Sequence, residues 1–216
     1  MSETTTRALI VLNGEIEPSL PYVNREDYVH IVATDGALDV LLENDWPPTV
    51  ALGDFDSVNA GTLEIARSRG IYTLHTPDQD FTDFEKALNF VEAETVQSVD
   101  IIGHTGRRLD HTLGSIHATA RAAGRLNLQL IDPIGTGHLI AAGETFEIDD
   151  CSGQTCSVIA LIPARVNLDG FRWPLNESRL GGVDGQSVSN EIASDRARVR
   201  VLDGVAMVYL HHAPCA

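Results

Sequence analysis

The sequence TVALGDFDSVNAGTLEIARSRGIYTL, residues 49–74, decides the fold class of the first half of the chain. Residues 49–52 and 71–74 are short runs rich in apolar and β-branched side chains. Between them, Asn59 suits the N-cap of a helix that stops at Gly70. A strand, a helix and a second strand in this order predict a parallel β-α-β unit whose sheet is covered on both faces.

The same alternation continues on both sides of this unit. Short apolar runs predict further strands at 7–12, 28–33, 99–102 and 126–131. Apolar residues at helical spacing predict further helices at 36–43, from Thr82 onward and at 109–123. We therefore expect an α/β domain over residues 1–134, built on a doubly wound, mostly parallel, Rossmann-like sheet.

After Pro133 the helical periodicity disappears. Short runs separated by Gly, Asp and Asn turns predict strands at 137–141, 145–148, 155–162, 188–192, 197–202 and 205–210. This pattern is typical of a small all-β sandwich domain, which we place at residues 135–216.

The overall charge and composition limit the partners of the protein. The 216 residues carry 15 basic and 31 acidic side chains, a formal net charge of −16, and 43% of them are apolar. This balance argues against nucleic acid and anionic membrane surfaces, but a bound metal ion would still permit nucleotides. Three cysteines (Cys151, Cys156 and Cys215), an N-terminus unlike a signal peptide and no long apolar run favour a cytoplasmic protein that is not in a membrane.

Polar turns follow several of the predicted strands. They contain Asp35, then Asp54 and Asp56, then the segment 75–80, and finally the segment 103–110. In an open α/β sheet, ligands bind outside the carboxyl ends of the strands. These turns are therefore expected to form one site at one edge of the sheet.

The composition of two of these turns predicts a metal–polyphosphate site. Lys86, the only lysine, ends the acidic segment 78–86. Crowded carboxylates repel one another unless a cation lies among them, and Mg²⁺ held by one or two carboxylates usually also binds phosphate oxygens. Asp54 and Asp56, two residues apart after Gly53, can reach one ion, while a lysine is a compact charge suited to phosphate.

The start of the helix after Thr82 adds further candidate residues to this metal–polyphosphate site. Asp80 and Asp83 lie on either side of the helix start, and Thr82 can cap a helix whose N–H groups face a phosphate. Lys86 lies one turn further on the same helix face. The macrodipole also favours acids in a first turn, so Asp83 and Glu85 have a purely structural alternative.

Arg107 and Arg108 follow another predicted strand and can form a bidentate phosphate clamp. As a pair of arginines they can equally face solvent. His111 is a candidate ligand or, alternatively, a helix-capping or core histidine. The chain contains neither a P-loop nor a G-x-G-x-x-G fingerprint.

The order of these motifs resembles the thiamine pyrophosphokinase (thiamine diphosphokinase) family. The resemblance covers nearly the whole chain and rests on residues 35–37, 53–57, 78–88, 103–113, 170–175 and 188–191. It implies transfer of the pyrophosphoryl group of ATP to the hydroxyethyl oxygen of thiamine, leaving AMP. It also implies a homodimer, with thiamine between the catalytic domain of one subunit and the β domain of the other.

The resemblance further implies roles for individual residues. Those assigned to Mg²⁺ are Asp54, Asp56 and Asp83. Those assigned to ATP are Asp35, Gly36, Thr82, Lys86, Arg107, Arg108 and His111, of which Lys86 and Arg108 neutralise phosphate. Those assigned to thiamine are Trp173, Ser189 and Asn190, although Trp173 has the alternative of a packed core tryptophan. Asp80 or Asp110 is the candidate acceptor of the thiamine hydroxyl proton.

Two departures from the family pattern keep other functions open. Ala37 and Arg107 stand where the family usually has glycine, and each adds a side chain where the backbone can approach a ligand. One alternative is a pyrophosphokinase for another hydroxymethyl acceptor, such as a pterin. Another is a non-catalytic sensor of thiamine or nucleotide.

Overall fold

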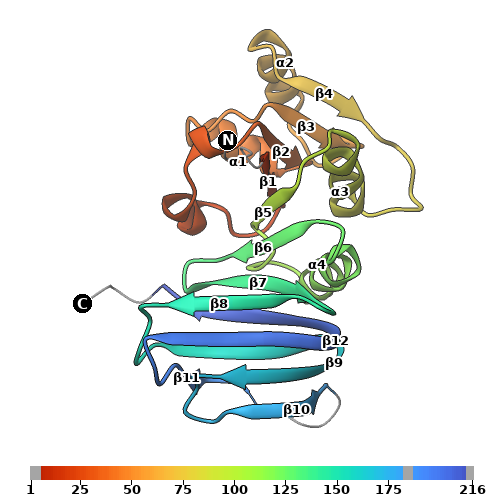
Figure 1. The fold of residues 1–216 in the computed structure, drawn as a ribbon. Helices are drawn as coiled ribbons and strands as arrows, with labels where there is room; N and C mark the ends of the chain where they lie inside the picture. The colour runs from red at the N-terminus through yellow and green to blue at the C-terminus, as the bar shows by residue number, and fades with distance from the viewer. Residues whose placement is uncertain (1–5, 182–186, 213–216) are drawn as a thin grey trace, which may run out of the picture. The chain divides into compact units, whose positions relative to one another are not determined.

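The computed structural model describes residues 6–181 and 187–212 (Figure 1). The first five residues of the N-terminus and Cys215 lie outside the described residues, and Cys156 is a buried free cysteine. The chain divides into two compact units, one of residues 1–118 with 126–133 and the other of 119–125 with 134–216.

The first unit is built on a parallel sheet. Its strands are β1 (Arg7–Val11), β2 (His30–Thr34), β3 (Val50–Gly53), β4 (Tyr72–His75), β5 (Ser98–Ile102) and β6 (Asn127–Ile131). They lie in the order β6-β5-β1-β2-β3-β4, and each neighbouring pair is parallel. The chain order reverses beside β1, and ligands of open α/β sheets bind at such a reversal, outside the carboxyl ends of the strands.

Helices alternate with these strands, which confirms the predicted alternation. They are α1 (Ala37–Glu43), α2 (Ala60–Ser68), α3 (Asp83–Ala93) and α4 (Leu109–Ala122). Helix α3 begins at a capping box, in which Thr82 and Glu85 each satisfy a backbone N–H of the other. Its apolar side chains at helical spacing are buried: Phe84, Ala87, Leu88 and Val91.

Some local expectations for the first unit were incomplete. Asn59 occupies the N-cap of α2, but its side chain makes no capping hydrogen bond. Two 3-10 helices, Glu17–Tyr22 and Arg25–Asp27, lie between β1 and β2 and were not predicted. Such short helices show no 3.6-residue periodicity, which explains why the apolar pattern did not reveal them.

The second unit is antiparallel. Its strands are β7 (Gly135–Ala141), β8 (Thr145–Asp149), β9 (Thr155–Asp169), β10 (Leu175–Leu180), β11 (Asn190–Glu191) and β12 (Arg196–His211). They pair in the order β10-β9-β12-β7, with β8 also on β12 and β11 also on β9. Over the whole chain the pairing is thus mixed, and a parallel sheet describes only the first unit.

The strand boundaries of the second unit differ from prediction at a bulge. The runs 197–202 and 205–210 form one strand, β12, whose register on β9 shifts around Gly204. Gly204 has φ 78°, and a Cβ there would lie 2.1 Å from the carbonyl oxygen of Pro163. The strand predicted over residues 155–162 continues through Pro163 to Asp169, because proline is tolerated at bulges.

Two other expectations for strands were wrong. Strand β10 was missed because its sequence, LNESRL, lacks the β-branched apolar residues that indicate a strand. The predicted strand 188–192 is reduced to the two residues of β11.

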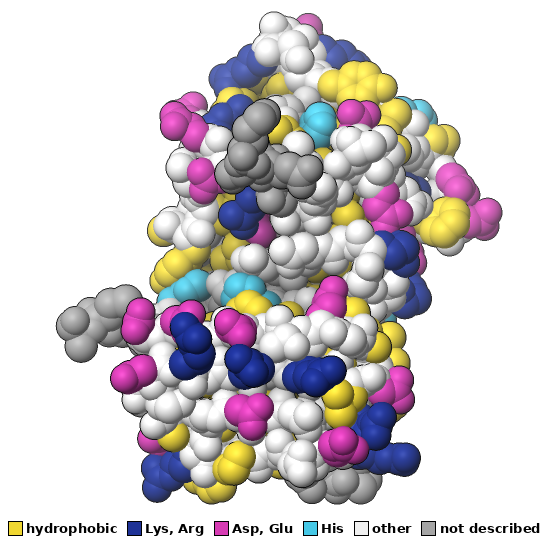
Figure 2. All heavy atoms as spheres, viewed as in Figure 1, with side chains coloured by type: hydrophobic (Ala, Val, Ile, Leu, Met, Phe, Trp, Pro, Cys, Tyr) yellow, Lys and Arg dark blue, Asp and Glu magenta, His cyan; other side chains and the backbone are white. Residues whose placement is uncertain are grey.

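The exposed side chains over β8 and β12 are charged with both signs intermixed (Figure 2). Arg196 pairs with Asp149 at 2.8 Å, and Arg198 pairs with Glu147 at 3.0 Å. Arg196 and Arg198 are thus each neutralised by an acid on the neighbouring strand. Among the described residues, no helix is long and apolar enough to cross a membrane.

Candidate functional site

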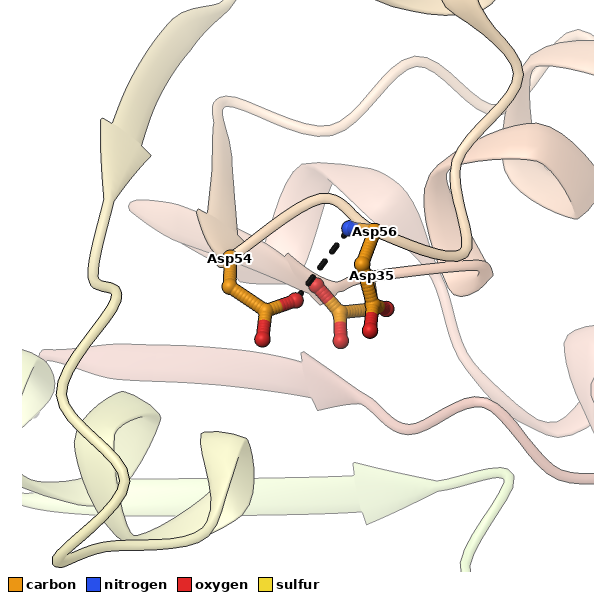
Figure 3. Close-up of side chains that lie close together, drawn as sticks. All are labelled: Asp35, Asp54 and Asp56. Atoms are coloured by element: carbon orange, nitrogen blue, oxygen red, sulfur yellow. Dashed lines mark hydrogen bonds between the residues drawn. The ribbon is translucent and has the colours of Figure 1, made fainter.

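Three carboxylates meet at the carboxyl edge of the parallel sheet (Figure 3). Asp35 follows β2, and Asp54 and Asp56 follow the neighbouring strand β3. One oxygen from each lies within 4.8 Å of the others. A set of oxygen ligands at this separation fits Mg²⁺, which is bound through carboxylates and water.

The backbone of the turn after β3 holds this cluster in place. Phe55 adopts φ 61°, and its N–H donates to Oδ1 of Asp35 at 3.2 Å. The N–H of Asp56 donates to Oδ1 of Asp54 at 3.2 Å. A Cβ on Gly53 would lie 1.8 Å from Oδ1 of Asp35, so glycine there leaves room for the carboxylate. A non-glycine residue at positive φ is uncommon, and such strain often accompanies a functional site.

The acids of the cluster perturb one another's pKa values. The pKa of Asp35 is raised to about 7, mainly by burial and then by a hydrogen bond with Asp83 and the charge of that residue. The pKa of Asp54 is instead lowered, mainly by the N–H of Asp56. Asp83 therefore lies close to Asp35, and four acids share one region. A divalent cation would relieve their repulsion.

Replacing Asp35 with asparagine should stabilise the metal-free protein at neutral pH. The pKa of Asp35 lies near 7 in the folded chain, against about 4 when unfolded. Between these values only the folded state holds the proton, so the free energy of unfolding falls as pH rises toward 7. We expect Asp35→Asn to gain roughly 1 kcal/mol or more at pH 8.

Thermal midpoints in EDTA from pH 5 to 8 measure this effect. The gain of Asp35→Asn over the wild type should grow with pH, while Glu64→Gln, an exposed change in α2, should show no such trend. If the thermal midpoints of the wild type and Asp35→Asn change in parallel with pH, the pKa of Asp35 is not raised in the folded protein.

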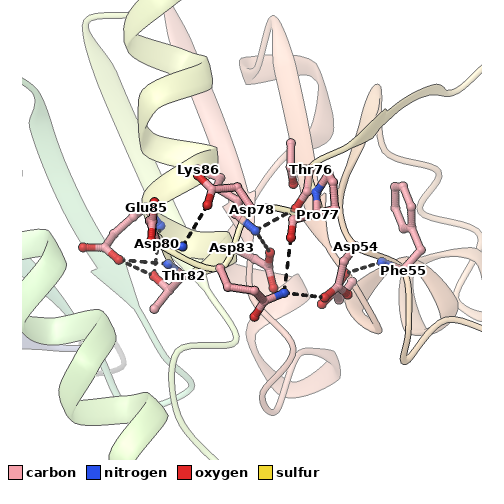
Figure 4. Close-up of polar contacts among 12 residues, drawn as sticks. Asp54, Phe55, Thr76, Pro77, Asp78, Asp80, Thr82, Asp83, Glu85 and Lys86 are labelled. Atoms are coloured by element: carbon pink, nitrogen blue, oxygen red, sulfur yellow. Dashed lines mark hydrogen bonds and ion pairs between the residues drawn. The ribbon is translucent and has the colours of Figure 1, made fainter.

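The start of α3 brings Lys86 to the same region (Figure 4). Its Nζ donates to the carbonyl oxygen of Thr76 at 2.8 Å and to Oδ1 of Asp83 at 3.2 Å. The Lys86 side chain is 10% exposed and that of Asp83 31%, so this ion pair is largely shielded from solvent. The Thr82 hydroxyl donates to Oε2 of Glu85 at 2.9 Å, and the two residues cap the helix.

Sequence reasoning missed one residue of this region. The Nε2 atom of Gln79 donates to Oδ2 of Asp54 at 3.3 Å and so joins the segment before α3 to the cluster. Its place within the acidic segment 78–86 was the available signal. Asp80 is exposed, and its N–H donates to Oδ1 of Asp78 at 2.9 Å.

The loop after β5 carries two arginines with different partners. Nη1 of Arg107 donates to Oδ1 of Asn13 at 2.7 Å. Arg108 forms a bidentate pair with Asp110 at 3.1 and 2.6 Å, and both side chains are more than 60% exposed. Arg108 lowers the pKa of Asp110 through this pair. His111 is exposed, which contradicts the alternative of a core histidine.

The residues assigned to thiamine belong to the second unit. Asn190 is buried, accepts from the N–H of Trp173 at 3.2 Å and donates to its carbonyl oxygen at 2.9 Å. The Trp173 side chain is 54% exposed, so the alternative of a packed core tryptophan is wrong. Arg172 lies 5.1 Å from the ring centroid of Trp173. Ser189, at φ 56°, is exposed and its N–H donates to Oγ of Ser157 at 2.9 Å.

Comparisons with known proteins agree with these motifs. Residues 22–130 match the family model described as thiamin pyrophosphokinase, catalytic domain. Residues 144–206 match the model described as thiamin pyrophosphokinase, vitamin B1 binding domain. A curated relative, thiamine pyrophosphokinase of Bacillus subtilis (strain 168), is 25% identical over 184 residues, which cover 82% of this chain and 85% of that protein.

Solved structures share the fold over nearly the whole chain. Thiamin pyrophosphokinase from Geobacillus thermodenitrificans aligns with a TM-score of 0.80 and 25% identity, covering 97% of this chain and 99% of that one. Yeast thiamin pyrophosphokinase aligns with a TM-score of 0.81 and 18% identity, covering 97% of this chain and 87% of that one. The two family models span most of the sequence in the order that the motifs predict, and the chain belongs to the thiamin pyrophosphokinase family.

Proposed function

We propose that this protein transfers the pyrophosphoryl group of ATP to the hydroxyethyl oxygen of thiamine, producing thiamine diphosphate and AMP. Membership of the family supports this reaction. The observation in this chain that supports it best is the carboxylate cluster beside Lys86. Transfer of a phosphoryl-type group depends mainly on positioning and charge neutralisation, which a metal site and a lysine supply.

We assign the Mg²⁺ ligands to Asp54, Asp56 and Asp83. Asp35, whose carboxylate lies with those of Asp54 and Asp56, is a fourth candidate ligand. Mg²⁺, when bound, would offset negative charge on the phosphate oxygens. Lys86 is held at this place by Thr76 and Asp83 and offers a second positive charge to the polyphosphate.

The other ATP-binding assignments are Asp35, Gly36, Thr82, Arg107, Arg108 and His111. Arg108 needs to leave Asp110 to reach a phosphate, and such an exposed ion pair costs little to break. That exchange would free the Asp110 carboxylate, which with Asp80 is a candidate acceptor of the thiamine hydroxyl proton.

For the acceptor we assign Trp173, Ser189 and Asn190. An exposed indole ring offers a face to a cationic heterocycle such as thiamine, and the acidic protein attracts such a cation. The buried Asn190 fixes the backbone of Trp173 through two hydrogen bonds.

The arrangement of the parts is also inferred. We place catalysis in residues 1–134 and thiamine binding in a β sandwich of residues 135–216, with a homodimer in which the two parts of different subunits share thiamine. Because parallel crossovers are right-handed, the order β6-β5-β1-β2-β3-β4 supports a doubly wound unit, with α1 and α2 on one face and α3 and α4 on the other. A cytoplasmic location is expected for such a protein.

An acceptor panel tests the proposed function. With ATP and Mg²⁺, we expect AMP to form with thiamine and not with a hydroxymethylpterin. AMP formation only with the pterin would identify a related pyrophosphokinase, and binding of thiamine and ATP without AMP would identify a sensor. Either result would contradict the proposal.

A further inference from the structure

The loop after β1, residues 12–15, is packed tightly against the loop after β5. The N–H of Glu15 donates to the carbonyl oxygen of Thr105 at 2.8 Å. A Cβ on Gly14 would lie 2.1 Å from the carbonyl oxygen of Gly103, so only glycine permits this approach. Both loops lie at the point where the strand order reverses, on the edge that carries the carboxylates. The backbone around Asn13 is therefore held rigidly at the ligand-binding edge.

The side chain of Asn13 is oriented by Arg107. Nη1 of Arg107 lies 2.7 Å from Oδ1 of Asn13. A guanidinium group has only donors, so the amide oxygen has to face it and the NH₂ group has to face away. A Cβ on Gly36 would lie 2.6 Å from Nδ2 of Asn13. The NH₂ group thus lies against Gly36, directly after Asp35 of the carboxylate cluster.

The NH₂ group of Asn13 has two N–H donors. Among residues 6–181 and 187–212, Asn13 uses its oxygen in a hydrogen bond, while its Nδ2 makes none. The side chain is only partly buried, so a ligand can reach it. A neutral donor beside several acids suits a phosphate oxygen, which needs donors and is repelled by carboxylates.

We propose that Asn13 is a further nucleotide-binding residue, whose NH₂ group donates to a phosphate oxygen of ATP, and that Arg107 is the positioning residue that fixes its amide. The inference rests on the proposed function, since it takes ATP as the nucleotide. With Asn13, the loop after β1 becomes part of the proposed site. The rest of that site is built from the turns after β2, β3 and β5 and from the start of α3.

The test is Asn13→Asp, which keeps the shape and the oxygen that Arg107 needs but replaces the NH₂ group with an acceptor. We expect KM for ATP to rise about tenfold or more, with KM for thiamine and the thermal midpoint little changed. Asn13→Ser should act in the same direction without adding charge. Asn89→Asp makes the same chemical change on the exposed face of α3 and should leave all values unchanged.

Arg107→Ala separates positioning from direct binding. It should raise KM for ATP severalfold in the wild type and have a smaller effect in the Asn13→Ser background, because the amide it positions is then gone and no charge has been introduced. Equal effects of Arg107→Ala in both backgrounds would contradict its positioning role.

If both Asn13 variants keep the wild-type KM for ATP, the inference is wrong. The hydrogen bond between Arg107 and Asn13 then serves only to link the two loops. Calorimetry with Mg-ADP repeats the comparison without turnover. If the wild type makes no thiamine diphosphate, a tenfold weaker Kd in Asn13→Asp still supports the role of Asn13, and an unchanged Kd overturns it.

Discussion

Asp56→Asn should reduce turnover by roughly a thousandfold or more while leaving the fold intact, because it removes one of the proposed metal ligands from a cluster of acids. Asp56 is exposed, and its side chain is no part of a hydrophobic core. Asparagine retains the N–H that donates to Asp54. Removing one negative charge also relieves repulsion, so the thermal midpoint without Mg²⁺ should stay the same or rise.

The measurements are kcat with thiamine, Mg²⁺ affinity by calorimetry and the thermal midpoint. Asp169→Asn, an equally exposed change at the end of β9, is the matched control and should retain wild-type values. Turnover in Asp56→Asn within a few-fold of the wild type would refute its role as a metal ligand.

Lys86→Ala should lower turnover by about a hundredfold or more, with a much smaller effect on stability. The ammonium group makes two hydrogen bonds, to Thr76 and Asp83, so its loss should cost about 1–3 kcal/mol of folding free energy. In the proposed reaction, however, Lys86 would offset charge on the transferred group in the transition state, and the sequence has no other lysine to replace it.

Lys86→Arg is the informative companion variant. It retains the charge, but its planar fork is wider than an ammonium group and cannot occupy the same place between Thr76 and Asp83. We expect it to remain folded and to recover only part of the lost turnover. If Lys86→Ala changes the thermal midpoint but not kcat, Lys86 has only a structural role.

The apolar patterns of the sequence predicted the elements of the first unit well. Short buried runs such as β1 and β5 and the capped, amphipathic α3 carry signals in their own residues. The family resemblance, stated from motifs such as Gly53–Ser57, is confirmed by the family models. The same motifs led to Asp54 and Asp56, which the structure brings together with Asp35.

The features that were not predicted depend on tertiary contacts. The pairing of Asn13 with Arg107 joins residues 94 positions apart, and no local pattern reveals it. In the sequence, Arg107 is a departure from the family pattern that adds a side chain near a ligand. No sequence pattern identifies Asn13 as its partner. Likewise, the two strands predicted at 197–202 and 205–210 form one strand with a bulge at Gly204, opposite Pro163. The long-range pairing of β12 with β9 outweighs the local turn signal of that glycine.

Labelled phosphates of ATP, followed in the presence of Mg²⁺ and thiamine, distinguish pyrophosphoryl transfer from phosphoryl transfer. With separate labels in the α and γ phosphates, we predict that the γ label appears in thiamine diphosphate, that the α label remains in AMP, and that the two products form in equal amounts. Formation of ADP with thiamine monophosphate, or no transfer of the γ label to thiamine, would contradict pyrophosphoryl transfer to thiamine.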